Sequence, residues 1–314
     1  MIAVLGAGAF GTALAVTLAR EGRAVTLWAR DPGRLAGGQS PRLPGIALPD
    51  TVTVTGDARA IAPAGIVLLA VPMQALAGLL SAHRTLWPGK VLVAASKGID
   101  LQRLTGPSAL IRDLAPGAEA AVLTGPSFAA DIARGLPTAL TLACAGPQAE
   151  TVQAALSTAT LRLYLTDDLA GAELGGALKN VIALAAGAAI GAGLGDSARA
   201  AILTRGFAEM TRAAAALGAR PETLTGLSGL GDLALTCTSE QSRNYRSGLA
   251  LGRGAAVDPA LTVEGMATAR AMTRLAAEHG LDLPVTRAVA ALVAGETSVA
   301  AALAGLMARP LRTE

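Results

Sequence analysis

The sequence predicts an α/β protein, in which an N-terminal, doubly wound, mainly parallel sheet is followed by an all-α C-terminal domain. Three observations support this prediction. Short β-branched runs alternate with helical patterns through the first half, a glycine-rich turn follows the first run, and the second half is alanine-rich and helix-periodic. Strand–helix alternation is typical of a sheet covered by helices on both faces. A length of 314 residues suggests two domains, which we place at 1–166 and 167–314.

Eight β-branched or apolar runs account for the strands that we expect. In chain order they cover residues 2–5, 24–29, 52–55, 66–71, 91–95, 120–123, 138–143 and 161–165. Runs of this composition favour buried strands. Helical patterns lie between them at residues 12–21, 73–83, 107–114, 128–134 and 147–157. After Thr166 the pattern changes, because Asp167-Asp168 can cap a helix and helix-periodic sequence continues from there.

Composition excludes several classes of function. The net charge is only +3 although the pI is about 9.2, no cluster of five or more Lys and Arg occurs, and the few aromatic residues do not interleave with the arginines. We therefore expect no nucleic-acid partner. Cys144, Cys237, His83 and His279 lie far apart without ligand-like spacing. We expect no metal site and a reducing, cytoplasmic location.

The mean hydropathy of +0.49 raises the question of membrane insertion. Residues 1–19 carry no charged side chain, but they lack the basic start of a signal peptide, and the glycines of a fixed-spacing pattern at 6, 8 and 11 interrupt them. The apolar run 181–195 is too short to span a bilayer. We interpret both segments as protein core and expect no membrane insertion.

The turn between the first strand and the first helix has the spacing of a dinucleotide site. Gly6, Gly8 and Gly11 form a GxGxxG pattern directly after an apolar strand. The first glycine allows the tight turn, the second allows the backbone to approach a pyrophosphate, and the third allows close contact between helix and strand. Free N–H groups at the helix start can then bind the phosphates. This pattern predicts a Rossmann-type domain.

The tip of the second strand indicates which dinucleotide binds. An NAD-selective site usually has a carboxylate there, which holds the ribose 2′-hydroxyl. In this chain Arg30 comes first and can pair with a 2′-phosphate, while Asp31 is expected to cap the following turn. We therefore expect NADP or NAD as cofactor, with NADP favoured. The alternative, that Arg30 is an ordinary exposed cation, remains open.

Lysine is so rare in this chain that each one is informative. Lys90, Lys97 and Lys179 are the only lysines among 26 basic residues. Arginine cannot release its proton near neutral pH, whereas a desolvated lysine can titrate there. Lys179 stands just before the apolar run 181–195, so burial is expected to act on its pKa. We interpret Lys179 as a chemical rather than a structural residue.

Four further segments combine small residues with isolated polar ones. They are Ser96-Lys97-Gly98 and Gly125-Pro126-Ser127, each after a strand, and later Gly229-Leu230-Gly231-Asp232 and Ser242-Arg243-Asn244. In open α/β sheets, ligands collect at the carboxyl ends of the strands. Each segment alone could be a loop or a cap. Together with Lys179 they provide two lysines, an arginine, an aspartate and neutral donors, which suits a small phosphorylated carbonyl compound.

These residues carry a family resemblance. In chain order, LGGALKNVIA at 174–183, LGDLALTCT at 230–238 and QSRN at 241–244 resemble the bacterial NAD(P)-dependent glycerol-3-phosphate dehydrogenases. The similarity extends through nearly the whole chain. It implies a reversible reduction of dihydroxyacetone phosphate to sn-glycerol 3-phosphate, the precursor of glycerophospholipids.

Carried over residue by residue, the resemblance implies the following roles. Lys179 would exchange the proton and Asp232 would orient the reacting end, which makes them the catalytic pair. The substrate would also meet Lys97, Gly125 and Ser127, and its phosphate would meet Ser242, Arg243 and Asn244. The cofactor would meet Gly6, Gly8, Ala9, Phe10, Gly11, Arg30, Lys97, Ala129, Arg243, Thr262 and Glu264. Two positions depart from the family pattern: Ala9 replaces a common serine, and Ser197 replaces the usual asparagine of a Gly-x-Asn-Ala-Arg segment.

The expected chemistry follows from charge. Hydride arriving at a ketone carbon creates an alkoxide, which a neighbouring ammonium group can protonate as it forms. Lys179 can act in this way, while Arg243 offers a planar fork for phosphate oxygens. A β-hydroxyacid dehydrogenase and a non-catalytic nucleotide sensor are the alternatives. In the former, asparagine follows the lysine by a full helical turn, whereas Asn180 is adjacent here. The alanine-rich helices are compatible with a homodimer but do not establish one.

Overall fold

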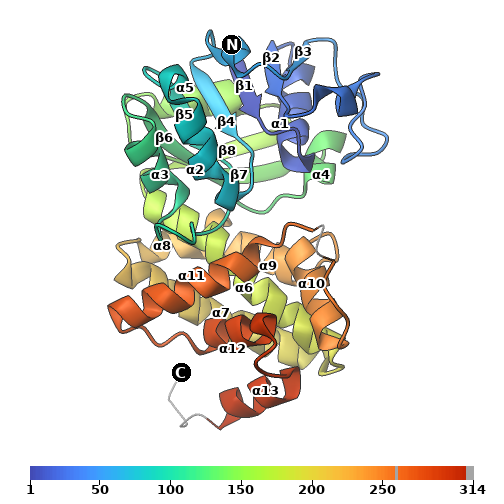
Figure 1. Cartoon of the computed structure of the whole chain (residues 1–314), viewed down its shortest axis with the longest axis vertical. Coiled ribbons are helices and arrows are strands. Elements are labelled where there is room, and N and C mark those ends of the chain that lie inside the picture. Colours follow the sequence, from blue (N-terminus) through green and yellow to red (C-terminus); the bar gives the residue numbers. More distant parts are fainter. Residues whose placement is uncertain (259–260, 309–314) are drawn as a thin grey trace.

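The computed structural model describes residues 1–258 and 261–308 of the chain. An α/β domain containing the N-terminus stands above a domain made of helices, and the chain passes from the first to the second after its last strand (Figure 1). The expected α/β fold with an all-α C-terminal domain is confirmed.

One sheet contains all eight strands found in the described residues. They are β1 (Ile2–Leu5), β2 (Val25–Trp28), β3 (Val52–Thr55), β4 (Ile66–Leu69), β5 (Val91–Ala94), β6 (Glu119–Thr124), β7 (Thr138–Cys144) and β8 (Leu161–Thr166). Their order is β3-β2-β1-β4-β5-β6-β7-β8. Every pair is parallel except β6 and β7. The order reverses direction between β1 and β4, which is the switch point where ligands bind in such sheets.

Helices cover both faces of this sheet. They are α1 (Ala9–Arg20), α2 (Met73–Ala82), α3 (Pro107–Leu114), α4 (Ala129–Arg134) and α5 (Ala149–Leu156). Leu14 of α1 and Leu156 of α5 share one core with β1 and β2. Leu76 of α2 and Ile111 of α3 share a second core with the other side of β1 and β4. The expected helix positions are confirmed, with shifts of up to three residues at their ends.

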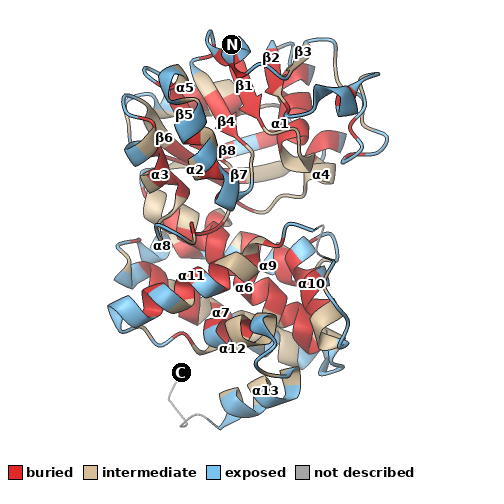
Figure 2. Ribbon diagram, in the orientation of Figure 1, coloured by how far each residue is buried: buried red, intermediate tan, exposed pale blue. Residues whose placement is uncertain are grey.

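The helical domain is built around α6. Its helices are α6 (Leu169–Gly191), α7 (Gly195–Ala216), α8 (Pro221–Thr225), α9 (Asp232–Cys237), α10 (Arg243–Gly252), α11 (Glu264–His279), α12 (Pro284–Ala294) and α13 (Val299–Met307). Asp168 begins α6 as expected, since its carboxylate accepts a hydrogen bond from Gly171 N at 2.9 Å. Within the described part of the chain, only α6 is long and apolar enough to span a bilayer, but it is largely buried inside the protein (Figure 2).

Glycines let α6 and α10 approach closely. A Cβ atom on Gly187 would lie 2.1 Å from the Tyr245 carbonyl oxygen, and one on Gly248 would lie 2.2 Å from that of Leu184. No larger side chain fits at either position without moving a backbone. The small residues of α6 therefore make close contact with α10, and α6 is held in one position relative to its neighbours.

Candidate functional site

The glycine-rich turn has the shape that the spacing predicts. Gly6 has φ +111°, and a Cβ atom there would lie 2.4 Å from the Ala70 carbonyl oxygen. A Cβ atom on Gly11 would lie 2.0 Å from the Gly6 carbonyl oxygen. Gly8 differs, because no other heavy atom would lie within 4 Å of a Cβ atom at this position. It also caps α1 without a side-chain bond, so the first N–H groups of the helix remain available to an anion.

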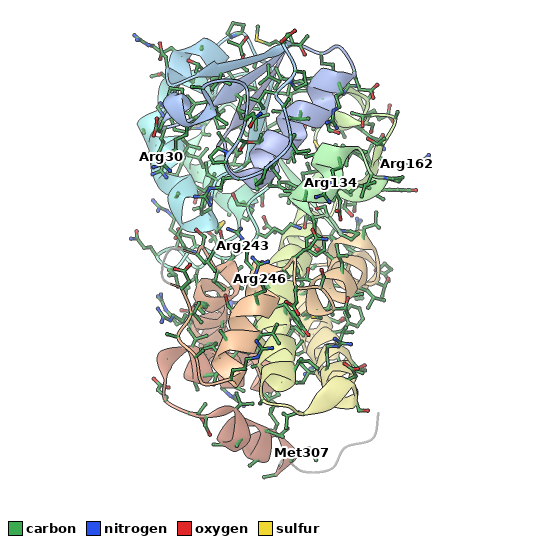
Figure 3. The ribbon with its side chains drawn as sticks, turned by 90° about the vertical axis from the view of Figure 1, so that its right-hand side faces the viewer. Arg30, Arg134, Arg162, Arg243, Arg246 and Met307 are labelled. Atoms are coloured by element: carbon green, nitrogen blue, oxygen red, sulfur yellow. The ribbon has the colours of Figure 1, made fainter. Side chains whose placement is uncertain are left out.

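The residues after β2 are arranged almost as expected. Arg30 is exposed, and Figure 3 shows it on the α/β domain. Asp31 occupies the N-cap position of the short 3₁₀ turn Pro32–Leu35, but its carboxylate does not cap a backbone N–H. It accepts a hydrogen bond from Arg34 Nε at 3.0 Å instead. The capping role expected of this side chain is therefore wrong, because the nearby guanidinium is the stronger partner.

Two lysines from different domains converge on one carboxylate. Lys179 of α6 donates to Asp232 Oδ1 at 2.7 Å, and Lys97 of the loop after β5 donates to Asp232 Oδ2 at 2.6 Å. Lys179 also donates to Thr236 Oγ1 at 2.7 Å, and Lys97 to the Gly125 carbonyl oxygen at 3.1 Å. Asp232 is 1% exposed and Lys179 is 7% exposed. We call Lys97, Lys179 and Asp232 the lysine–aspartate group.

The charges in this group perturb one another. Burial lowers the pKa of Lys179 to about 8; the Asp232 carboxylate opposes this effect, and the like charge of Lys97 adds to it. Burial by itself would raise the pKa of Asp232, but the two ammonium groups outweigh it and hold that pKa below its usual range. With both lysines protonated, the group carries one net positive charge. It can stabilise a developing oxyanion and supply a proton near neutral pH.

Gly125 and Ser127 lie beside this group. Gly125 has φ +134°, and its carbonyl oxygen accepts hydrogen bonds from both Lys97 and the Ser127 hydroxyl, the latter at 3.1 Å. The left-handed backbone turns this carbonyl towards Lys97, and the Leu140 backbone leaves little space for a side chain at Gly125. The structure thus brings together five residues that the sequence placed in one site.

The side chains of Ser242 and Asn244 at the start of α10 make hydrogen bonds within the protein that the sequence does not predict. Ser242 caps this helix by accepting a hydrogen bond from Tyr245 N at 3.2 Å. Asn244 is buried, donates to Asn180 Oδ1 at 2.8 Å and accepts from Gly265 N at 2.9 Å. It therefore joins α10 to α6 and α11, and one of its two amide N–H bonds is already used. A direct contact of Ser242 or Asn244 with a phosphate stays a prediction.

Arg243 has a different environment from its neighbours in sequence. Figure 3 shows Arg243 and Arg246 where the two domains meet. Arg243 keeps solvent contact, yet the surrounding protein lowers the pKa of its guanidinium by desolvation, with the Glu264 carboxylate opposing and the charges of Arg42 and Arg246 adding to the effect. Three guanidinium groups close enough to act on one another favour an anionic ligand.

The remaining cofactor candidates stand at or just before the starts of helices. Ala129 is the first residue of α4, and Thr262 is exposed just before α11. Glu264 accepts a hydrogen bond from Met73 N at 3.1 Å, and burial raises the pKa of its carboxyl group. Among the residues that the structure describes, no group of three or more His, Cys, Asp or Glu side chains is placed to hold a metal ion.

Two residues near the site, Thr236 and Arg42, were not predicted. Thr236 contacts both Lys179 and Asp232, and its position four residues after Asp232 on α9 could have revealed it. Arg42 lies in an irregular loop. The next residue of this loop, Leu43, is buried against α1 and α4, so the loop folds back over the start of α1. No local pattern indicates that fold, because it depends on packing between distant segments.

Comparison with known proteins agrees with this geometry. The family model described as the NAD-dependent glycerol-3-phosphate dehydrogenase N-terminus matches residues 1–150, and the corresponding C-terminus model matches residues 168–304. A relative named glycerol-3-phosphate dehydrogenase [NAD(P)+] from Cereibacter sphaeroides is 62% identical over the full length of both chains. One of the same name from Paracoccus denitrificans is 61% identical over 100% of this chain and 99% of its own.

Solved structures give the same result. A glycerol-3-phosphate dehydrogenase from Coxiella burnetii superimposes with a TM-score of 0.94 and 36% identity, covering 98% of each chain. A ketopantoate reductase from Ralstonia eutropha has a TM-score of 0.64 at 18% identity, covering 94% of this chain and 97% of its own, and this likeness shows the fold alone.

Proposed function

Because this chain belongs to the NAD-dependent glycerol-3-phosphate dehydrogenase family, we propose that it reduces dihydroxyacetone phosphate to sn-glycerol 3-phosphate with NADPH or NADH. The reaction is reversible and supplies glycerophospholipid synthesis. The observation that carries the proposal is the lysine–aspartate group, in which a buried ammonium with a pKa of about 8 stands at the junction of the two domains.

Both domains contribute to the site in this proposal. Residues 1–166 bind the dinucleotide, and residues 167–314 contribute Lys179, Asp232 and Arg243. The open space beside Gly8 and the uncapped start of α1 fit a pyrophosphate, with Ala9, Phe10 and Ala129 beside it. Thr262 and Glu264 complete the cofactor side from the start of α11. When bound, the nicotinamide supplies the hydride.

Lys179 performs the proton transfer. As negative charge develops on the ketone oxygen, its ammonium group releases a proton to that oxygen, and in the reverse direction the neutral amine takes the proton back. Asp232 and Thr236 hold the ammonium in one orientation through the two hydrogen bonds at 2.7 Å. Lys97 adds a second positive charge that stabilises the oxyanion.

The substrate phosphate is bound at the start of α10. Arg243 provides two parallel N–H donors, and the Ser242 hydroxyl and the second N–H of Asn244 supplement them. A three-carbon substrate has few other groups to bind, so energy from the phosphate is available to orient the carbonyl towards Lys179.

Arg30 supports a preference for NADP, because an exposed guanidinium at the strand tip suits a 2′-phosphate. We also place the enzyme in the cytoplasm without membrane insertion, since α6 is buried in the protein and both cysteines are free thiols. A homodimer formed through the alanine-rich helices completes the proposal, and sedimentation velocity of the pure protein would reveal it.

The test is an assay of the purified protein. Dihydroxyacetone phosphate and NADPH are mixed with it, and the absorbance of reduced nicotinamide is followed. Substrate-dependent loss of absorbance is expected, whereas a β-hydroxyacid dehydrogenase would respond only to its own substrates and a nucleotide sensor would show none. A Lys179→Ala variant that kept the wild-type rate would disprove the proton role of Lys179.

A further inference from the structure

Two helices of the α/β domain take their N-terminal caps from the helical domain. The N-cap residues of α2 and α3 are Pro72 and Gly106, and neither makes a side-chain capping bond. Glu264 of α11 accepts from Met73 N at the start of α2, and Glu173 of α6 accepts from Ser108 N at the start of α3. Carboxylates are favourable at such positions because of the free N–H groups and the helix dipole.

Glu173 makes the more extensive of these contacts. Its Oε2 accepts from Ser108 N at 3.0 Å and its Oε1 from the Ser108 hydroxyl at 3.1 Å. A Cβ atom on Gly106 would lie 2.5 Å from the Glu173 Cδ atom, so the carboxylate approaches the helix start as closely as a glycine permits. Burial raises the pKa of Glu173 to about 7, while the Ser108 donors and the Arg112 charge oppose that rise and Asp168 adds to it.

This contact lies at the far end of the segment that carries Lys97. The segment runs from the end of β5 to the start of α3, so Glu173 fixes where it ends. Near its beginning, the Ser96 hydroxyl donates to the Val71 carbonyl oxygen at 2.7 Å. Glu173 and Lys179 belong to the same buried helix, α6. One rigid element therefore holds both Lys179 and the end of the Lys97 segment.

We propose that Glu173 is a positioning residue for the reaction, which sets Lys97 of one domain against Lys179 and Asp232 of the other. This inference rests on the function proposed above for the lysine–aspartate group. A merely structural cap would contribute stability alone, whereas a positioning residue also controls how strongly Lys97 acts on Lys179.

That influence is measurable through the titration of Lys179. The groups that act on its ammonium are Asp232 and Cys237 of α9, which raise its pKa, and Lys97 of the facing loop, which lowers it. If loss of the Glu173 contact lets Lys97 move away, the repulsion weakens and the pKa of Lys179 rises. Moving a unit charge away by several ångströms corresponds to a shift of roughly one pH unit.

The experiment uses the scarcity of lysine. Protein labelled with ¹³C at the lysine Cε atoms gives three signals to follow against pH, and the signal lost in Lys179→Arg identifies Lys179. In Glu173→Ala we expect the pKa of Lys179 to rise by roughly one unit. We also expect kcat/KM for dihydroxyacetone phosphate to fall roughly tenfold or more. Glu173→Gln retains an acceptor for the Ser108 N–H and a donor for its hydroxyl, so it should restore both quantities towards wild type.

Glu209 offers a matched control. This buried carboxylate caps α12 inside the helical domain, accepting from Val285 N at 2.8 Å and Thr286 N at 2.9 Å. Glu209→Ala should lower the melting temperature without moving the Lys179 titration. An unmoved titration in Glu173→Ala would overturn the inference.

The role of Glu173 can still be tested if Glu173→Ala does not fold or if the wild-type protein lacks the proposed activity. If Glu173→Ala does not fold, Ser108→Ala removes one of the two hydrogen bonds, and a shift in the same direction but smaller is required. If the wild-type protein does not oxidise NADPH with dihydroxyacetone phosphate, the proposed function fails, whereas the titration of Lys179 still decides whether Glu173 positions Lys97.

Discussion

Replacing Asp232 by asparagine tests the charge balance of the lysine–aspartate group most directly. The side chain keeps its size, but the carboxylate that contacts both ammonium groups, at 2.6 and 2.7 Å, becomes neutral. For unit charges about 4 Å apart at an effective dielectric constant of about 20, the lost attraction is about 4 kcal/mol. This corresponds to about three pKa units, and Lys179, whose pKa is already about 8, should become largely neutral at pH 7.

The expected kinetic effect follows from that titration. With a pKa lowered by about three units, roughly one Lys179 in a hundred remains protonated at pH 7, so reduction should slow about a hundredfold. Initial rates with dihydroxyacetone phosphate and NADPH between pH 5 and pH 9 would measure this, and lower pH should recover part of the activity. Asp168→Asn is the control, because it neutralises another buried aspartate while asparagine can still cap α6. If the reduction rate of Asp232→Asn still falls only above about pH 8, this reasoning is refuted.

The other predictions concern pH, cofactor choice and packing. In the wild type, reduction should fall as pH rises through about 8 and Lys179 loses its proton, while oxidation of sn-glycerol 3-phosphate should rise over the same range; parallel profiles in both directions would contradict this. Arg30→Ala should weaken NADPH binding roughly tenfold or more, the scale of a charge-assisted hydrogen bond, with little effect on NADH; equal losses in a fluorescence titration would show that Arg30 does not contact the 2′-phosphate. Gly248→Ala should destabilise the protein by about 1–3 kcal/mol, because its Cβ atom would lie 2.2 Å from the Leu184 carbonyl oxygen; an unchanged midpoint in urea would mean that α10 shifts freely along α6.

Local features of the sequence were sufficient for most of the fold. The strands β1 and β3 and the helix α3 have the expected limits, and the others differ by only a few residues. The largest shift is at α1, which begins at Ala9 rather than Thr12, because the extended Gly8 acts as its cap. Hydrophobic periodicity and the GxGxxG spacing are encoded within a few consecutive residues, so they can be recognised without knowing the rest of the molecule.

Three members of the lysine–aspartate group were named from the sequence, but Thr236 and the contacts among these residues were not. The scarcity of lysine and the family resemblance identified Lys97, Lys179 and Asp232. That a single carboxylate would bind both lysines was not predictable, since the pairs are separated by 135 and 53 residues along the chain. The family resemblance implied a phosphate contact for Asn244, and only the structure shows that its amide also bonds to Asn180 and Gly265.

The sequence by itself therefore determined the secondary structure, the fold class and the inventory of reactive groups. Only the tertiary structure decided the antiparallel pairing of β6 with β7, the proximity of the two lysines and the capping of α3 by Glu173. The physical reason is the distance along the chain over which each kind of interaction acts. Propensity and periodicity act between neighbours in the chain, whereas burial, desolvation and charge pairing depend on which distant segments the packed core brings together.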